Sequence, residues 1–264
     1  MVEVWKSIGE HVIRFQCIGP GALRFLEMMF GNRPDPEEVD KRTAYTIRIE
    51  QGCTMNDGKT TTVSQTRSGC YRFERPDYEL VIQPDFRETS IRFYDFMGLR
   101  SVLVNWYSAL ITYLDWGVVI HSSSLVHNGE GYLFAGLSGA GKSTVARLSL
   151  PRPLLSDEAS IVKLDGEGQL RVYDSPLRSD LLQSDAVRSV PLKGIYLLQQ
   201  APQINAYSLD ATSALMSIFD KVWYFPYETT QSMKLVRLCK RLIERVPIYR
   251  LEFQNNDAFW EAIS

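Results

Sequence analysis

A glycine-rich segment constrains this chain more than any other feature. Residues 136–143 read Gly-Leu-Ser-Gly-Ala-Gly-Lys-Ser, and Thr144 follows. This matches G-x-x-x-x-G-K-S/T at every fixed position, the pattern of a loop whose backbone N–H groups surround phosphate oxygens. Residues 132–135 are typical of a short apolar strand entering the loop, and residues 142–150 of a helix leaving it. We therefore expect a nucleotide-phosphate site, with a glycine-rich turn that binds nothing as the alternative.

Each part of this segment has an expected role. Lys142 would neutralise the β- and γ-phosphates of ATP, and Ser143 would ligate Mg²⁺, with Thr144 as a second candidate. The N-terminus of the following helix would face the phosphates. The α- and β-phosphates would be bound by the loop's backbone, at Gly136, Ser138, Gly139, Ala140 and Gly141.

Two acids follow a short apolar strand after the loop helix. Leu154-Leu155 is the strand, and Asp157 and Glu158 lie just beyond it. A nucleotide site in an α/β protein needs a carboxylate at such a position, for Mg²⁺ or for the attacking hydroxyl. The alternative is an exposed acidic turn.

The patterns predict a mixed α/β fold with two parts. Residues 1–97 form a β-rich N-terminal lobe, with alternating segments at 45–49, 70–73 and 90–93, one helix at 21–30, a charged run at 35–42 and a turn at 56–58. Residues 98–264 form the nucleotide-binding part. There a strand at 118–126 and a tight turn at 127–131 form a hairpin that leads into the loop. The lobe is a candidate for substrate recognition.

Further helices are predicted at 99–116, after Asp210, and at 230–246. The last has a basic face, which by default is solvated, with docking of an acidic or phosphorylated partner as the alternative. Its cations are Lys234, Arg237, Lys240, Arg241 and Arg245.

Composition excludes several classes. The 264 residues carry a formal net charge of −2, so no global basic field points to nucleic acid. The apolar runs are too short to cross a membrane, and the first residues lack a signal-peptide core, so a cytoplasmic protein is expected. Cys17, Cys53, Cys70 and Cys239 are scattered, which favours reduced thiols over zinc binding.

Residues 119–173 resemble the kinase domain of the HPr kinase/phosphorylase family, whose core is shared with ATP-dependent phosphoenolpyruvate carboxykinase. The resemblance lies in His121 on the strand before a hairpin, in Ser138-Gly139-Ala140-Gly141-Lys142-Ser143, and in Asp157-Glu158. The acidic motif of this family normally has two aspartates, whereas here the second acid is Glu158. Thr144 stands where the family often has an acidic residue after the loop serine. The size of the chain and its β-rich N-terminal lobe resemble the lasso-peptide tailoring kinases more than the bacterial HPr kinases. The tailoring kinases phosphorylate the C-terminal serine of a precursor peptide.

The resemblance implies ATP and Mg²⁺ and assigns roles at the site. Asp157 would be the base or orient the acceptor hydroxyl, and Glu158 would help hold the metal, although the two could exchange roles. His121 would lie near the γ-phosphate; otherwise it is a half-buried strand histidine. Apart from the resemblance, Arg178 would balance charge on the transferring phosphoryl group, as arginines often do, or else be a surface cation.

The resemblance implies a kinase for a serine hydroxyl on a peptide or small protein. A kinase for a small hydroxy amino acid and a nucleotide-binding regulatory module are the alternatives. Hexamers are known among the relatives, so a homo-oligomer is one expected state, which the peptide-tailoring branch need not share.

Overall fold

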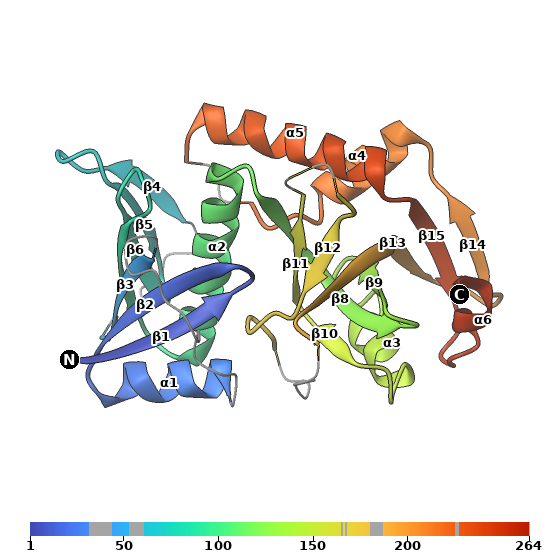
Figure 1. Cartoon of the computed structure of the whole chain (residues 1–264), viewed down its shortest axis with the longest axis horizontal. Helices are drawn as coiled ribbons and strands as arrows, with labels where there is room; N and C mark the ends of the chain where they lie inside the picture. Colours follow the sequence, from blue (N-terminus) through green and yellow to red (C-terminus); the bar gives the residue numbers. More distant parts are fainter. Residues whose placement is uncertain are drawn as a thin grey trace. The chain divides into compact units, whose positions relative to one another are not determined.

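The computed structural model describes residues 1–31, 44–52, 61–164, 166, 168–179, 187–224 and 227–263. It divides into two compact units, Met1–Trp106 and Tyr107–Ser264. Each contains a mixed sheet, which confirms the mixed α/β fold class (Figure 1). The predicted boundary after residue 97 lies at the start of helix α2 (Phe96–Tyr113), whereas the units divide within this helix. The predicted run 35–42, the turn 56–58 and Cys53 lie outside the described residues.

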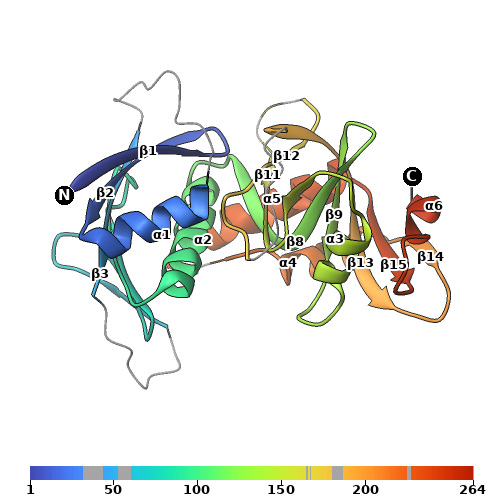
Figure 2. The same cartoon turned by 90° about the horizontal axis from the view of Figure 1, so that it is seen from below.

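The first unit is a seven-stranded sheet with helices on one side (Figures 1 and 2). Its strand order is β1-β2-β3-β7-β6-β5-β4, with β2, β3 and β7 parallel and the other pairs antiparallel. Every second residue of β7 is buried, because one face packs on the helices and the other meets solvent. The elements are β1 (Val2–Ile8), β2 (His11–Ile18), α1 (Pro20–Phe30), β3 (Tyr45–Gln51), β4 (Thr62–Gln65), β5 (Tyr71–Arg75), β6 (Tyr78–Ile82) and β7 (Glu88–Phe93).

Helix α2 begins three residues before the predicted start at 99 and ends three before the predicted end at 116. The Asp95 carboxylate accepts a hydrogen bond from the Gly98 N–H, 2.9 Å away, which satisfies a free donor of the first turn. At the other end Asp115 has a left-handed φ of 56°, which the helix cannot continue through. Capping and backbone geometry, not the apolar stripe, set these bounds.

The second unit contains an eight-stranded sheet. Strands β8, β11, β12, β13 and β9 pair in turn, and β9 pairs again with β8, so these five close a circuit. The strands are β8 (Gly117–His127), β9 (Glu130–Ala135), β10 (Leu154–Ser156), β11 (Ala159–Lys163), β12 (Arg171–Tyr173), β13 (Ser189–Gln200), β14 (Asn205–Ser208) and β15 (Ile248–Phe253). The helices are α3 (Lys142–Leu148), α4 (Ala211–Phe219), α5 (Thr229–Arg245) and α6 (Phe259–Ile263).

Helices cover both faces of this sheet. Helices α4 and α5 lie on one face and α3 on the other (Figures 1 and 2). The α3 face has an aromatic core that includes Phe134, Phe253 and Trp260. The Trp260 indole N–H donates to the Ser149 hydroxyl, 3.0 Å away, which ties α6 to the end of the loop helix. The core therefore holds α3, the helix that follows the glycine-rich loop, against the sheet.

The predicted hairpin is confirmed. Strands β8 and β9 are antiparallel, with Ser122 opposite Ala135, the last residue before the loop. Strand β13 pairs in parallel with β9 on one side and β15 on the other. The loop thus leaves the sheet with β8 on one side of its strand and β13 on the other.

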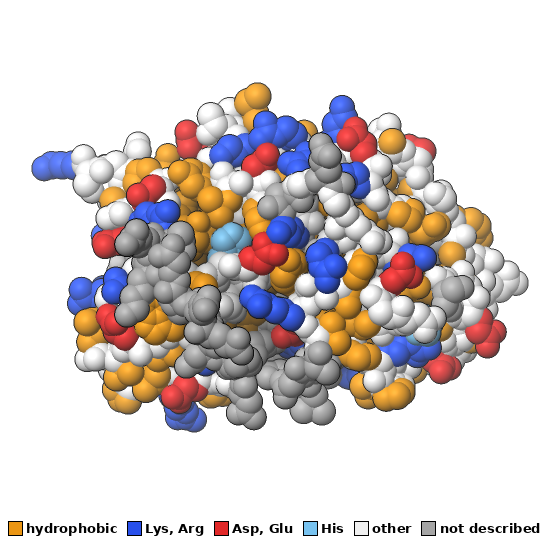
Figure 3. Space-filling view, in the orientation of Figure 1, with side chains coloured by type: hydrophobic (Ala, Val, Ile, Leu, Met, Phe, Trp, Pro, Cys, Tyr) orange, Lys and Arg blue, Asp and Glu red, His pale blue; other side chains and the backbone are white. Residues whose placement is uncertain are grey.

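The predicted basic face of α5 is not simply solvated. Lys234 donates to the Tyr113 carbonyl, 2.7 Å away, Arg237 and Arg241 pair with Asp115, and Arg241 and Arg245 donate to the Leu164 carbonyl. Over α5, Figure 3 shows basic side chains with acidic ones among them. These cations hold neighbouring segments of the unit, which leaves few for a docking partner.

Among the described residues, none of the helices has the length and hydropathy to cross a membrane. Cys17, Cys70 and Cys239 are free thiols. Burial raises the pKa of Cys17 to about 11 and that of Cys239 to about 12, so both are protonated and unreactive near neutral pH.

Candidate active site

The glycine-rich loop lies between β9 and α3, as predicted. Gly139 and Gly141 have positive φ values of 80° and 108°, in the left-handed region that favours glycine. The Ala140 N–H donates to the Leu137 carbonyl at 3.1 Å, which closes the turn. A Cβ on Gly136 would lie 2.6 Å from the Ala140 Cβ. The loop is therefore too compact for a side chain at Gly136, and its backbone conformation favours glycine at Gly139 and Gly141.

Lys142 is the first residue of α3, and its side chain lies across the loop. Its ammonium donates to the carbonyls of Gly136 at 2.9 Å and Leu137 at 3.1 Å. Burial lowers the pKa of Lys142; the Glu158 carboxylate opposes this shift, and the Lys221 ammonium adds to it. A buried cation that lacks a full counter-charge stabilises an anion placed beside it.

The other loop residues face solvent or the helix. Leu137, Ser138, Gly139 and Ser143 are exposed, and Thr144 is half-buried. Among the described residues, no three His, Cys, Asp or Glu side chains gather into a metal site of their own. Mg²⁺ at a phosphate site usually takes one or two protein ligands, with phosphate oxygens and waters completing the shell. The Ser143 hydroxyl and the Glu158 carboxylate are donors of the right class.

The two acids have different surroundings. Asp157 is buried, and its carboxylate accepts hydrogen bonds from the Ser179 N–H at 2.9 Å and the Ser179 hydroxyl at 2.6 Å. Glu158 is partly exposed, and its Oε1 lies 3.5 Å from Nδ1 of His121. Glu158 is also the acid whose charge acts on Lys142. The pair is not the exposed turn of the alternative interpretation.

His121 lies on β8, near the base of the loop as predicted. Its backbone N–H donates to the Lys221 carbonyl at 2.7 Å, and its ring centroid is 5.4 Å from that of Trp223. The tilted contact with Trp223 and the contact with Glu158 hold the ring on two sides. The structure thus brings His121, Glu158 and Lys142 together.

Arg178 is not the surface cation of the alternative interpretation. It is buried, and its guanidinium donates to the Leu154 carbonyl at 2.9 Å and the Ser175 carbonyl at 3.0 Å. It also pairs with the Asp174 carboxylate. These contacts hold the segment before Ser179 against β10, which gives Arg178 a structural role, and charge balance on a phosphoryl group stays a prediction.

Sequence reasoning missed Ser179 and Lys221. Ser179 lies in a segment that has no periodicity, and only the folded chain brings it to Asp157. Lys221 follows α4, pairs with Asp220, and meets β8 through its backbone. No local signal marks either residue, because both depend on long-range pairing.

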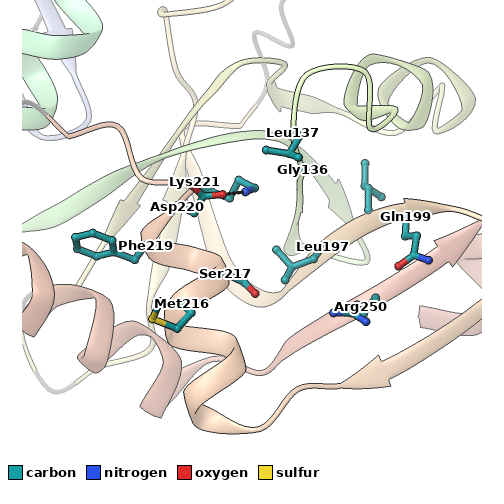
Figure 4. A pocket seen from close by; sticks show the side chains of 11 residues that line it. Gly136, Leu137, Leu197, Gln199, Met216, Ser217, Phe219, Asp220, Lys221 and Arg250 are labelled. Atoms are coloured by element: carbon teal, nitrogen blue, oxygen red, sulfur yellow. Dashed lines mark hydrogen bonds and ion pairs between the residues drawn. The ribbon is translucent and has the colours of Figure 1, made fainter.

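A cleft of about 590 Å³ opens beside the loop, on the α4 face of the sheet. Figure 4 shows Gly136 and Leu137 on one side, Met216 and Ser217 of α4 across from them, and Leu197 between. The lining residues are Gly136, Leu137, Leu197, Leu198, Gln199, Met216, Ser217, Phe219, Asp220, Lys221 and Arg250.

The fold and the site define a mixed α/β protein whose glycine-rich loop has the phosphate-binding sequence pattern. A family model described as "SynChlorMet cassette protein ScmC" matches residues 87–264. The chain belongs to this family. No curated protein matches it.

A solved structure that matches is the Hpr(Ser) kinase/phosphatase from Coxiella burnetii, at 13% identity. The match covers 55% of this chain and 92% of that chain, with a TM-score of 0.33. A similarity this weak defines neither the fold nor the activity, and the narrower likeness to lasso-peptide kinases stays a prediction.

Proposed function

We propose that this chain is an ATP-dependent kinase that transfers the γ-phosphate to a serine hydroxyl of a peptide or small protein. The observation that carries the proposal is the convergence of Lys142, Glu158 and His121 at the loop, with the buried Asp157 next in sequence to Glu158. Phosphoryl transfer needs this kind of positioning and charge neutralisation more than covalent chemistry.

The loop would bind the nucleotide. Backbone N–H groups at Gly139 and Gly141 would face the α- and β-phosphates, and the Lys142 ammonium would exchange its two carbonyl acceptors for β- and γ-phosphate oxygens. The buried position of this ammonium means that it loses little hydration when the phosphates arrive.

Ser143 and Glu158 are the residues proposed to hold Mg²⁺. When bound, Mg²⁺ neutralises negative charge on the β- and γ-phosphates. The Glu158 carbonyl accepts a hydrogen bond from the Ser122 N–H at 3.1 Å, and Ser122 lies opposite Ala135, the last residue before the loop. Glu158 is therefore close to the loop at which the phosphates would bind. His121 holds the Glu158 side chain in place.

Asp157 is proposed to orient the acceptor and accept its proton. The serine hydroxyl oxygen forms a bond to the γ-phosphorus, the bond from the γ-phosphorus to the β–γ bridging oxygen breaks, and ADP leaves. The hydroxyl proton passes to the Asp157 carboxylate, whose two oxygens keep lone pairs beyond those that accept from Ser179. Ser179 is a positioning residue for this carboxylate.

The family description names a cassette protein, so peptides encoded in the same cassette are the first acceptors to test. The purified protein is incubated with Mg-ATP and each peptide, and the intact mass of the peptide is measured. We expect a gain of one phosphate group with the native protein and with Met233→Ala, an exposed change on α5, and none with Lys142→Ala. A peptide that never gains phosphate, under conditions where the protein binds ATP, would overturn the peptide assignment.

The two alternatives give different results in the same assay. A small-molecule kinase would release ADP only when free serine or a similar alcohol is added. A regulatory module would bind ATP without turnover. The N-terminal lobe supports a macromolecular acceptor, because a small substrate does not need it.

A further inference from the structure

We propose that the cleft beside the loop binds the nucleoside part of ATP, with its base against Leu137, Met216 and Phe219 and its ribose towards Arg250 and Gln199. This inference rests on the proposed function and deepens it. The glycine-rich loop would contact only the phosphates of ATP, so recognition of the nucleotide base requires a second subsite. The cleft volume of about 590 Å³ lies within the usual range for small-molecule sites.

The cleft is continuous with the loop. Gly136 and Leu137 line it, and the carbonyls of these two residues are the acceptors of the Lys142 ammonium. A ligand whose phosphates bind Lys142 therefore has its other end at the mouth of the cleft. Figure 4 shows this mouth between Leu137 and the end of α4.

The sheet topology sets the direction of the ligand. Strand β9 ends at the loop, with β8 on one side and β13 on the other. Strand β10, which leads to the acids, pairs with β8, whereas Leu197, Gln199 and Arg250 come from β13 and β15. A triphosphate across the loop thus points its γ end to the acids and its nucleoside to the cleft.

The exposed side chains of the cleft fit a flat base. Leu137 is 68% exposed, Met216 69% and Phe219 42%, so three large apolar side chains meet solvent at one concavity. Such a patch commonly marks a binding site, and a heteroaromatic base covers it with little loss of polar hydration. Arg250 and Gln199 supply polar groups that a ribose or a base edge can meet.

The cleft is poorly placed for the acceptor. A proton acceptor must lie within hydrogen-bonding reach of the attacking hydroxyl. None of His121, Asp157 and Glu158 lines the cleft. An acceptor bound there would hold its hydroxyl away from the proposed base.

Calorimetry with two ligands tests the inference. The affinities of Mg-ATP and of magnesium tripolyphosphate, which lacks a nucleoside, are measured for the native protein, Phe219→Ala, Arg250→Ala and Met233→Ala. Met233 is the matched control, because it is 70% exposed on α5 and does not line the cleft. We expect each cleft variant to bind ATP about tenfold more weakly, from the loss of one contact, with tripolyphosphate binding and the control unchanged.

The outcomes separate the two proposals. If Lys142→Ala loses ATP binding and the cleft variants bind ATP as the native protein does, the inference about the cleft is overturned and the proposed function stands. Cleft variants that raise the KM of the acceptor and leave ATP affinity intact overturn it in favour of an acceptor site. A native protein that binds neither ligand overturns the proposed function and this inference with it. Thermal unfolding of each variant confirms that these surface changes leave the fold intact.

Discussion

Replacement of Gly141 by alanine tests whether the loop's shape depends on contacts beneath it. Gly141 precedes α3 with a φ of 108°, and a Cβ there would lie 2.6 Å from Cζ of Phe253. Phe253 is buried on β15, and its ring packs edge-on against the ring of Phe259, with the two ring centroids 6.1 Å apart. The ring therefore has little freedom to move aside.

Two costs add at this position. A left-handed backbone costs a non-glycine residue about 1–2 kcal/mol. Overpacking against a fixed core side chain costs about 1–3 kcal/mol. We therefore expect Gly141→Ala to lower the free energy of unfolding by roughly 2–5 kcal/mol. Gly139→Ala is the matched control, since its φ is 80° but no atom lies within 4 Å of its Cβ, and only the backbone cost of about 1–2 kcal/mol applies.

Urea unfolding of both variants measures the difference, and ATP titration shows whether the loop has shifted. Adding Phe253→Leu to Gly141→Ala should recover part of the steric cost, with a coupling energy of about 0.5–3 kcal/mol. Equal destabilisation by Gly141→Ala and Gly139→Ala, with no coupling to Phe253, would refute the packing argument.

Three further predictions concern charged side chains. Lys142→Met should raise the free energy of unfolding without nucleotide, because the folded state disfavours the ammonium, whose pKa lies below its ordinary 10.5. This gain in unfolding free energy is complete at pH values below the lowered pKa of Lys142. It decreases as the pH rises through that pKa towards 10.5, where the lysine of the unfolded chain also loses its proton. Denaturation at neutral and alkaline pH measures the gain, and a loss of stability at neutral pH would contradict the prediction. Arg178→Ala should cost about 3–5 kcal/mol in urea unfolding, since Asp174 is left without its buried partner; unchanged stability with a slower kcat would instead favour the role first predicted. Asp115→Asn keeps a residue type that tolerates the left-handed backbone and removes the pairs with Arg237 and Arg241; we expect a loss below about 1 kcal/mol that shrinks in high salt, and a larger, salt-independent loss would mean that the pairs act through packing.

The local parts of the site could be predicted from the sequence. The loop, its entry hairpin and the acids after β10 each have a short-range signal: glycine spacing, turn residues, or an apolar run followed by charge. The positive φ values of Gly139 and Gly141 agree with the reason those glycines were singled out. These features depend on neighbours in the chain, which the sequence displays directly.

The remaining parts depend on residues distant in the chain. The closed circuit of strands follows from the pairing of β12 with β13 and of β9 with both β8 and β13, which no local pattern encodes. Arg178 looked like a free cation because its partners, the Leu154 and Ser175 carbonyls and Asp174, carry no sequence pattern. The short helix α6 was missed because five residues give too little periodicity, although its Trp260 is buried in the core.

The proposed transfer step is tested most directly by its rate in a single turnover. Native protein and Asp157→Asn, each saturated with Mg-ATP, are mixed with the peptide acceptor, and the phosphopeptide is quantified over time. The account predicts that Asp157→Asn slows transfer by about 10²–10⁴-fold, the usual contribution of a general base, while the Kd for ATP stays unchanged. Equal rates for the two proteins would contradict the role of Asp157, and no transfer by the native protein to any acceptor would contradict the kinase assignment itself.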